Sequence, residues 1–212
     1  MNFDWVLQVP ILFFSIIVHE FSHGWAAFLH GDDTAERHGR LTLNPLPHVD
    51  VFGTLLLPAL CALGGSPIFG WAKPVPVDPS RLRGRWAVVT VSLVGPLSNI
   101  ALAVAAAIAF RLSVFAAGGM PDFQETLSEA FRFGVILNLY LAAFNLVPIY
   151  PLDGSQALAG FLPERWAAIY EKHAPYGFLI ILFLLMTGLL SAIIIPFVRL
   201  GLVLMAALGI FW

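Results

Sequence analysis

Charged side chains are scarce in this sequence of 212 residues. They make up 11% of it, and hydrophobic residues make up 59%, whereas a soluble domain has about 25% charged and roughly 45–50% apolar residues. The mean hydropathy is +0.85, so polar groups are too few to cover a water-soluble surface. The scarcity of charge excludes an ordinary soluble fold and predicts an integral membrane protein with a single domain over residues 1–212.

The sequence also has little cysteine and no excess of positive charge. The single cysteine, Cys61, excludes an intramolecular disulfide and a metal site built from several cysteines. A net charge of −2 provides no basic surface for nucleic acid. The first residues, MNFDW, lack the positive charges that begin a signal peptide, so the first apolar run is expected to stay in the protein.

Long apolar runs, by contrast, are frequent. A helix needs about 20 apolar residues to cross a bilayer, and four runs are long enough: 5–29, 86–110, 133–152 and 176–198. The tail 200–212 is too short to cross straight. The sequence therefore predicts an all-α polytopic membrane protein with about four to six membrane segments, with a catalytic core at about 5–154 and C-terminal membrane segments in 176–212.

Residues 51–72 are apolar too, but glycines and prolines interrupt them. We interpret this segment as re-entrant, so that the chain leaves the membrane on the side where it entered. Eight of the eleven basic residues then fall on one side, which is predicted to be cytoplasmic, with the N-terminus outside. Those eight are Arg37, Arg40, Lys73, Arg81, Arg83, Arg85, Arg165 and Lys172, and the other three are Arg111, Arg132 and Arg199.

One apolar run carries an ionisable cluster. Residues 19–23 read HEFSH, an H-E-x-x-H pattern. On a helix His19 and His23 lie one turn apart on the same face, so both imidazoles can bind one metal ion, and Glu20 lies near enough to hold a water molecule. An ionisable group at the centre of a membrane helix costs at least about 2.5–3.5 kcal/mol and is functional by default. The cluster therefore predicts a metal site.

Catalytic zinc usually has three protein ligands and one open position, so a third ligand is expected at the same depth. Asp153 is the favoured candidate, because Pro148 and Pro151 interrupt the helix before it and Gly154 allows the chain to turn. Its carboxylate can then project inward; the alternative is a helix-ending aspartate at the lipid headgroups. The other histidines are interpreted as solvated or interfacial: His30, His38, His48 and His173.

Two asparagines fall at a similar depth. Asn145 lies about two turns before Asp153, and Asn99 lies in the run 86–110. Either amide can form a hydrogen bond between helices, and either can stabilise an oxyanion or orient a substrate carbonyl. We predict a catalytic role for Asn145, while Asn99 stays open between the two roles as a candidate for substrate binding.

Three motifs in this order resemble one known family. HEFSH at 19–23, GPLSN at 95–99 and NLVPIYPLDG at 145–154 together resemble the site-2 proteases, which are intramembrane zinc metalloproteases. GWAKPVPVDP at 70–79 resembles the compact prokaryotic members of that family. The resemblance covers most of residues 18–154, and three ordered motifs are far more specific than H-E-x-x-H alone.

The resemblance assigns roles to individual residues. It implies that His19, His23 and Asp153 bind one catalytic Zn²⁺ and that Glu20 is the catalytic base. Asn145 matches the family's asparagine eight residues before the aspartate. The likeness to compact prokaryotic members implies a prokaryotic plasma membrane, and the distribution of basic residues predicts an active site towards the cytoplasmic side. The chain departs from the family in leaving no room for a PDZ or regulatory nucleotide-binding domain, and any helix preceding the HEFSH helix is expected to be absent.

These residues predict a zinc metalloendopeptidase that hydrolyses peptide bonds in or near transmembrane segments of membrane-protein substrates. A substrate helix must unwind before cleavage, and residues 39–43 (GRLTL) have the alternation of a short strand that could pair with it. Two alternatives stay open: a metal transporter or sensor that uses the same ligands, and a non-catalytic relative that binds membrane helices. The sequence shows no second ligand cluster for transport, and Glu20 has no evident use in a protein that only binds.

Overall fold

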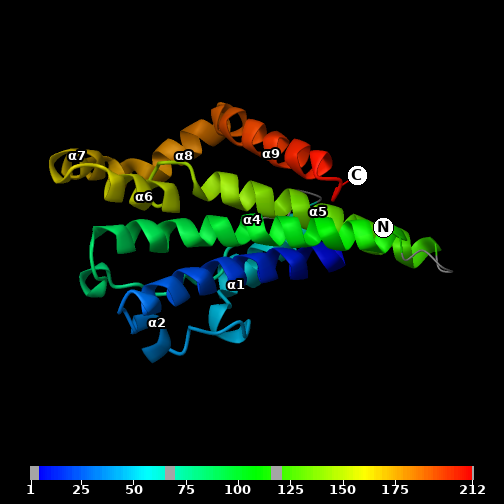
Figure 1. Ribbon diagram of the computed structural model, residues 1–212, viewed down its shortest axis with the longest axis horizontal. Helices are drawn as coiled ribbons and strands as arrows, with labels where there is room; N and C mark the ends of the chain where they lie inside the picture. Colours follow the sequence, from blue (N-terminus) through cyan, green and yellow to red (C-terminus); the bar gives the residue numbers. More distant parts are fainter. Residues whose placement is uncertain (1–4, 65–69, 116–120, 212) are drawn as a thin grey trace.

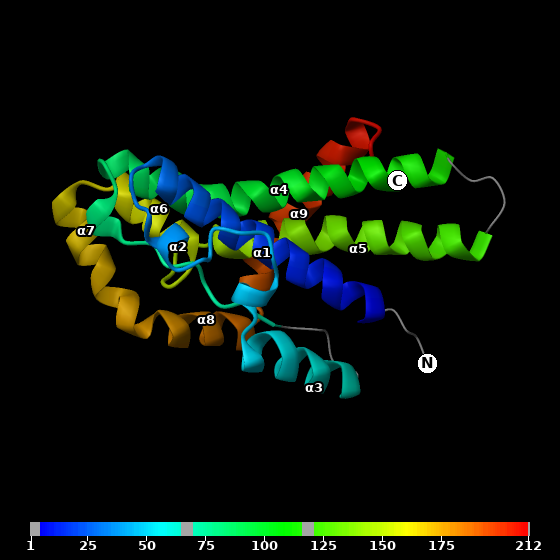
Figure 2. The same cartoon turned by 90° about the horizontal axis from the view of Figure 1, so that it is seen from below.

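Three long helices form the centre of the molecule. The computed structural model describes residues 5–64, 70–115 and 121–211, and within them α1 (Trp5–Leu29), α4 (Arg85–Phe115) and α5 (Pro121–Asn145) lie side by side (Figure 1). Short elements α2 (Thr34–Arg37), α6 (Asp153–Phe161) and α7 (Glu164–Tyr170) gather at one end of this group (Figure 2). The end where these short elements meet is also the end where α5 stops and α6 begins.

The helices are long and apolar enough to place the chain in a membrane. Among the described residues, five stretches have the length and hydropathy of a membrane span: Val6–Leu29, Trp86–Val114, Gln124–Asn145, Glu164–Met186 and Leu189–Ala207. The described part of the chain contains no strand. The predicted all-α polytopic membrane fold is therefore confirmed, and the protein is an integral membrane protein.

The main apolar core lies between α4, α5 and α9 (Leu189–Ala207). Ala103 and Ala107 of α4 are fully buried against it, and Val135 of α5 is fully buried as well. Small side chains let membrane helices approach closely, because their association depends on packing rather than on the exclusion of water. The close contact of α4 and α5 gives the rigid frame on which α1 packs.

The C-terminal segments differ from the prediction. Residues 176–198 do not form one span, because the chain breaks between α8 (Gly177–Met186) and α9 at Gly188, whose φ is +75°. Glycine adopts this left-handed conformation without steric cost. The predicted short tail at 200–212 was also wrong, since α9 continues through Pro196 to Ala207. The fourth apolar stretch starts earlier than predicted, with α7, η4 (Glu171–Tyr176) and α8 in succession.

The segment after the 3₁₀ turn η1 (Leu46–His48) leaves the helix group and returns to the same place. It forms a π-helix, η2 (Val51–Leu56), and then α3 (Leu57–Leu63). The N–H of Trp71 donates to the carbonyl oxygen of Gly53 at 3.0 Å, and the hydroxyl of Thr54 donates to that of Trp71 at 2.9 Å. The start and end of the segment are thus bonded to each other, which supports the re-entrant interpretation; residues 65–69 lie outside the described residues.

The predicted strand at 39–43 is wrong. Residue 39 lies in a turn and residues 41–43 form bends, and the carbonyl oxygen of Thr42 accepts a hydrogen bond from the His48 imidazole at 2.9 Å. The hydroxyl of Thr42 accepts a second bond, from the N–H of Asn44 at 3.1 Å. Local bonds of this kind compete with strand pairing, and alternation over five residues was too short a signal to exclude them.

Asp32 fastens the end of α1 to the segment 70–78, which precedes the short 3₁₀ turn η3 (Pro79–Arg81). Its buried carboxylate accepts hydrogen bonds from the N–H and hydroxyl of Thr34 and, at 2.7 Å, from the N–H of Asp78. Burial by itself raises the pKa of Asp32, but these hydrogen bonds outweigh it and hold the pKa below its usual value. Because the folded state has the lower pKa, the carboxylate stabilises the fold above the unfolded-state pKa of about 3.9, and this contribution is lost as the pH falls below that value.

Asp32→Asn is expected to lower the unfolding temperature at pH 7.5 and to have a smaller effect near pH 3.5. The amide loses the charge-assisted part of these bonds, and a hydrogen bond to a charged group contributes about 1.5–3 kcal/mol. Thermal unfolding of the detergent-purified protein at both pH values measures the difference. Asp33→Asn is the matched control, since Asp33 forms partly exposed ion pairs with Arg37 and Arg81 that contribute little. Equal losses in the two variants, or a loss independent of pH, would contradict this role.

Candidate active site

Two histidines of α1 face each other one helical turn apart. His19 and His23 are buried, with exposed fractions of 6% and 9%. Their Nε2 atoms are 3.0 Å apart. The spacing of four residues along the helix accounts for this proximity. Both imidazoles therefore direct the same ring nitrogen into one small volume.

Asp153 enters this volume from a different part of the chain. It is the first residue of α6 and follows the non-helical residues 146–152. Its Oδ2 lies 3.1 Å from His19 Nε2, and its Oδ1 lies 3.3 Å from His23 Nε2. A Cβ at Gly154 would lie 2.2 Å from the carbonyl oxygen of Leu146, so only glycine allows the chain to fold back this tightly. The structure thus brings the three predicted ligands together.

The chemistry of these three groups fits a cation. His23 Nδ1 is 2.6 Å from the carbonyl oxygen of Val91, which can only accept, so Nδ1 carries the proton and Nε2 presents a lone pair. His19 Nδ1 donates in the same way to Asn99 Oδ1 at 2.6 Å. Asp153 Oδ2 is buried and accepts no hydrogen bond from any residue that the structure describes. With Nδ1 protonated, a neutral ring directs its Nε2 lone pair into the volume that the carboxylate also faces, and this is the donor set that a cation requires.

The spacing of the ligand atoms also fits zinc. All three residues offer ligand atoms within 4.8 Å of one another. In a tetrahedral site with Zn–N bonds of 2.0–2.1 Å, neighbouring ligand atoms are about 3.3 Å apart, close to the distances between these groups. A site with three protein ligands leaves the fourth position open, as in catalytic zinc centres.

A buried amide network orients His19. Asn99 of α4 is fully buried; its Oδ1 accepts the His19 proton, and its Nδ2 donates to Asn138 Oδ1 at 2.9 Å and to the Ser15 carbonyl oxygen at 3.3 Å. Asn138 Nδ2 in turn donates to Ser15 Oγ at 2.9 Å. These bonds fix the tautomer and ring orientation of a ligand histidine. Of the two roles left open for Asn99, this geometry favours the contact between helices over contact with substrate.

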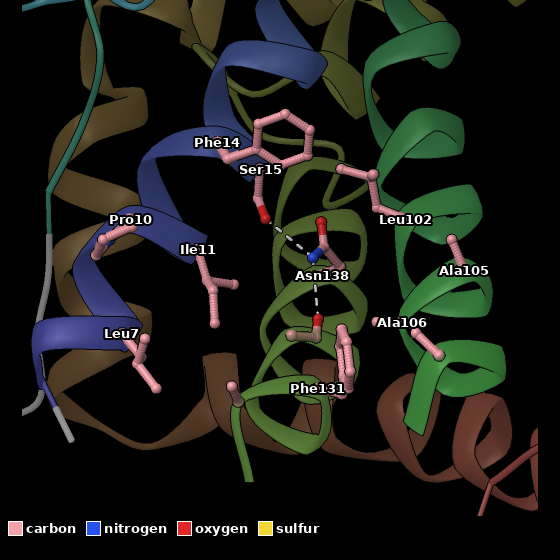
Figure 3. Close-up of a pocket in the computed structure, with 13 residues that line it drawn as sticks. Leu7, Pro10, Ile11, Phe14, Ser15, Leu102, Ala105, Ala106, Phe131 and Asn138 are labelled. Atoms are coloured by element: carbon pink, nitrogen blue, oxygen red, sulfur yellow. Dashed lines mark hydrogen bonds between the residues drawn. The ribbon is translucent and has the colours of Figure 1, made fainter. Parts of the chain in front are cut away.

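The network ends at an apolar cavity of about 530 Å³ between α1, α4 and α5. Figure 3 shows Ser15 and Asn138 bonded to each other at its wall, with Phe14 of α1, Leu102 of α4 and Phe131 of α5 around them. Apolar surroundings strengthen hydrogen bonds, because little water competes for the polar groups. The amide network is therefore a rigid support for the ligand side of α1.

Gly95 of α4 packs against the ring atoms that His19 and His23 direct into this volume. A Cβ at Gly95 would lie 2.4 Å from His23 Nε2 and 2.8 Å from His19 Cε1, well inside van der Waals contact. The helix backbone is thus packed directly on the rings. Any larger residue at this position requires the rings or the helix to move.

Glu20 and Asn145 are not among the three residues that converge on the candidate metal position. The half-buried Glu20 accepts a hydrogen bond at Oε2 from the N–H of Val75, at 2.7 Å. Asn145, the last residue of α5, donates from Nδ2 to the carbonyl oxygen of Leu141 at 3.0 Å. Among the described residues, no hydrogen bond joins either side chain to the His/His/Asp group. Their predicted catalytic roles stay predictions.

Sequence reasoning missed four members of the site. Ser15 is four residues before His19 and shares its helix face, and Asn138 is two turns before Asn145 on α5; both were visible as polar residues in apolar runs, a signal of function. The Val91 carbonyl and the Val75 N–H are backbone groups. No side-chain pattern in the sequence could have identified them.

Comparison with known proteins decides the family. A sequence profile of Peptidase family M50 matches residues 112–188. YwhC of Bacillus subtilis (strain 168), whose name provisionally describes it as a zinc metalloprotease, is 39% identical over 197 residues, which cover 91% of this chain and 86% of the relative. The chain belongs to peptidase family M50, the site-2 protease family.

Other proteins that are similar in sequence to this M50 chain are also named zinc metalloproteases. Rip2 of Mycolicibacterium smegmatis, also provisionally named a zinc metalloprotease, is 32% identical over 88% of the chain and 69% of the relative. Zinc metalloprotease MJ0392 of Methanocaldococcus jannaschii is 26% identical over 90% of the chain, which spans 45% of that relative. No solved structure matches the chain. The family assignment and the His/His/Asp geometry together support a metalloprotease.

Proposed function

We propose that this M50 protein is an intramembrane zinc protease, which hydrolyses peptide bonds in or near the transmembrane segments of membrane-protein substrates. One observation carries the proposal. The two histidines and Glu20 lie on a helix that is long and apolar enough to span a membrane, and Asp153 meets them there from another segment. Ionisable groups at such a depth are costly and mark functional sites.

His19, His23 and Asp153 would hold the zinc ion, which when bound supplies Lewis-acid polarisation of the scissile carbonyl and a water of lowered pKa. Glu20 lies next to His19 in the sequence and follows it on the same helical turn. Its carboxylate accepts a proton from the attacking water and passes it to the leaving amine nitrogen, acting as general base and then general acid. The buried imidazoles and the Asn99 network keep the three ligands in place during this exchange.

Asn145 is the proposed contact for the substrate carbonyl oxygen. It ends α5, next to the non-helical residues 146–152 that lead to Asp153. Its partner, the Leu141 carbonyl, belongs to the same helix, one turn earlier. A rotation of this side chain would direct the amide N–H to an incoming carbonyl, where charge develops in the transition state.

The site is proposed to open towards the cytoplasm. The helices α2, which contains Arg37, and α7, which contains Arg165, lie at the same end of the helix group as α6, which begins with Asp153 (Figure 2). Basic residues are enriched in cytoplasmic loops, so this end is assigned to the cytoplasmic side, with the start of α1 outside. The distribution supports a plasma-membrane protein that takes water and substrate from that face.

Removal of the metal tests the proposal. The protein is reconstituted in liposomes with a single-pass model substrate, and cleavage is measured before and after dialysis against 1,10-phenanthroline. Chelation is expected to reduce cleavage at least about 100-fold, because the metal supplies a large share of the stabilisation of the transition state. One equivalent of Zn²⁺ should restore the rate, and mass spectrometry of the products should place the cut in or next to the apolar segment.

Two results would overturn the proposal. Cleavage that survives complete removal of the metal would exclude a metalloprotease mechanism. Zinc-loaded protein that moves Zn²⁺ across the liposome membrane, without cutting any of a panel of single-pass substrates, would support the transporter alternative instead. A Ser22→Ala variant controls for purification and reconstitution. The Ser22 hydroxyl donates to the Val18 carbonyl oxygen of its own helix and has no proposed role in catalysis.

A further inference from the structure

We propose that the backbone N–H of Val75 positions the Glu20 carboxylate for proton transfer. This inference rests on the proposed function, because it assigns Glu20 the role of base. Val75 belongs to the segment 70–78, which crosses α1 beside the ligands without forming a helix. Its N–H donates to Glu20 Oε2 at 2.7 Å, a distance typical of charge-assisted hydrogen bonds.

The sequence around Val75 leaves this N–H as an isolated donor. Pro74 and Pro76 have no N–H, so Val75 supplies the single backbone donor of the tripeptide. Proline fixes its own φ and restricts the residue before it to extended conformations. The backbone at Lys73, Pro74, Val75 and Pro76 is therefore held in a narrow range before any tertiary contact forms. A stiff segment places its one donor with little loss of entropy.

A glycine of α1 lets the segment come this close. Gly24 lies one turn after Glu20 on the same face, and a Cβ there would lie 2.9 Å from Val75 Cγ1. The Val75 side chain is itself buried, with an exposed fraction of 8%. Glu20 thus accepts the Val75 N–H, while Gly24, one turn later, leaves space for the Val75 side chain.

The segment is held on both sides of Val75. Before it, the N–H of Lys73 donates to the His48 carbonyl oxygen at 2.9 Å, and the Arg40 guanidinium donates to the Pro74 carbonyl oxygen at 2.9 Å. After it, the N–H of Asp78 donates to Asp32 at 2.7 Å. These bonds do not involve Glu20. The position of the Val75 N–H is therefore set independently, and the carboxylate adjusts to it.

In this arrangement the two carboxylate oxygens of Glu20 have different roles. Oε2 is occupied by the Val75 N–H, which holds the side chain in one rotamer, and Oε1 stays available for the proton of the attacking water. Without this bond the exposed part of the glutamate can rotate about its side-chain bonds. Val75 is then a positioning residue, and its loss should affect the chemical step more than the binding of substrate.

Val75→Pro removes the N–H and Val75→Ala keeps it, which makes the two a matched pair. In the liposome assay with a single-pass substrate, Val75→Pro is expected to lower kcat about 10- to 100-fold with little change in KM, because an error of about 1 Å in a reacting group costs on the order of 100-fold. Val75→Ala should stay within about threefold of the wild type by the same argument. Both variants should bind one zinc ion per chain, since no ligand is altered.

Val75→Pro creates three consecutive prolines and could fail to fold. A second pair of variants tests the proposal without this change. Gly24→Ala adds the Cβ that conflicts with Val75 and should lower kcat as Val75→Pro does. The double variant Gly24→Ala/Val75→Ala removes the conflicting methyl group while keeping the N–H, and it should recover most of the activity. Because relief of this clash would also restore any lost stability, kcat is compared only between variants that are folded and loaded with zinc, and the remaining contact with Ala35 Cβ at 3.2 Å accounts for incomplete recovery.

Hydrogen exchange tests the bond without any reference to activity. The Val75 amide should exchange at least about 10-fold faster in Glu20→Ala than in the wild type, because the hydrogen bond to a charged acceptor is lost. The Lys73 amide, bonded to His48, serves as the internal control and should not change. Unaltered exchange at Val75 would overturn the proposed contact.

The kinetic and exchange results separate this inference from the proposed function. If the wild-type protein cleaves no substrate, the proposed function fails, and the exchange measurement still decides whether Val75 holds Glu20. If the wild type cleaves and Val75→Pro, folded and loaded with zinc, cleaves at the same kcat, the positioning role is wrong while the protease assignment stands.

Discussion

Glu20→Gln is expected to reduce cleavage of a transmembrane substrate about 10³- to 10⁴-fold, the upper part of the range for loss of a general acid–base group. The glutamine side chain has nearly the same shape and can still accept the Val75 N–H through its carbonyl oxygen. It cannot take a proton from water at neutral pH. Single-turnover cleavage in liposomes measures the chemical step directly.

Metal analysis of the same samples supplies the control for Glu20→Gln. Glu20 is not among the three groups that converge on the candidate metal position, so the variant should retain one zinc ion per chain. Its unfolding temperature should also match that of the wild type. Full activity in a pure, zinc-loaded Glu20→Gln preparation would exclude the proposed mechanism, whereas loss of both metal and activity would assign Glu20 to the metal site.

Gly95→Ala is expected to weaken metal binding strongly and to reduce cleavage. The added methyl group would lie 2.4 Å from His23 Nε2, so the imidazole must move by about 1 Å to reach ordinary contact. Displacement of a reacting group by this distance costs on the order of 100-fold, and here both ligand histidines are displaced. Zinc affinity, measured by competition with a chelator, should fall at least about 100-fold on this basis.

Gly134→Ala is the matched control for Gly95→Ala. It makes the same substitution in another long apolar helix, α5, but the added Cβ would meet Ala106 Cβ at 3.5 Å, which is ordinary contact. It should retain zinc and activity, and alanine in place of glycine should slightly stabilise the helix. If Gly95→Ala also retains zinc with wild-type affinity, the packing of α4 on the two imidazoles does not support the site.

Part of the site could be predicted because it follows from local spacing. His19 and His23 are four residues apart, and a helix brings such residues to one face whatever surrounds it. Pro148, Pro151 and Gly154 indicated that the chain unwinds before and turns after Asp153. The structure brings these three side chains together as the local signals required. Their binding of a metal ion stays a prediction.

The supporting contacts could not be predicted, since they depend on how helices cross. Asn99 meets His19 across 80 residues of sequence, and Val75 meets Glu20 across 55. A periodic pattern shows which face of a helix is buried but not which residue of another helix lies opposite. The same limit explains the error at 176–198, where hydropathy is continuous through Gly188 and the break depends on its backbone conformation.

The three candidate ligands are supplied by parts of the chain that are about 130 residues apart. At a synthesis rate of about 5–20 residues per second, Asp153 emerges roughly 7–26 s after His23. During that interval the nascent protein has two histidines but no complete set of ligands. Under the proposed function, a newly inserted chain has no complete metal site until α1 and the start of α6 have come together. The separation of the ligands along the sequence would thus delay the proposed activity until at least residue 153 has been made.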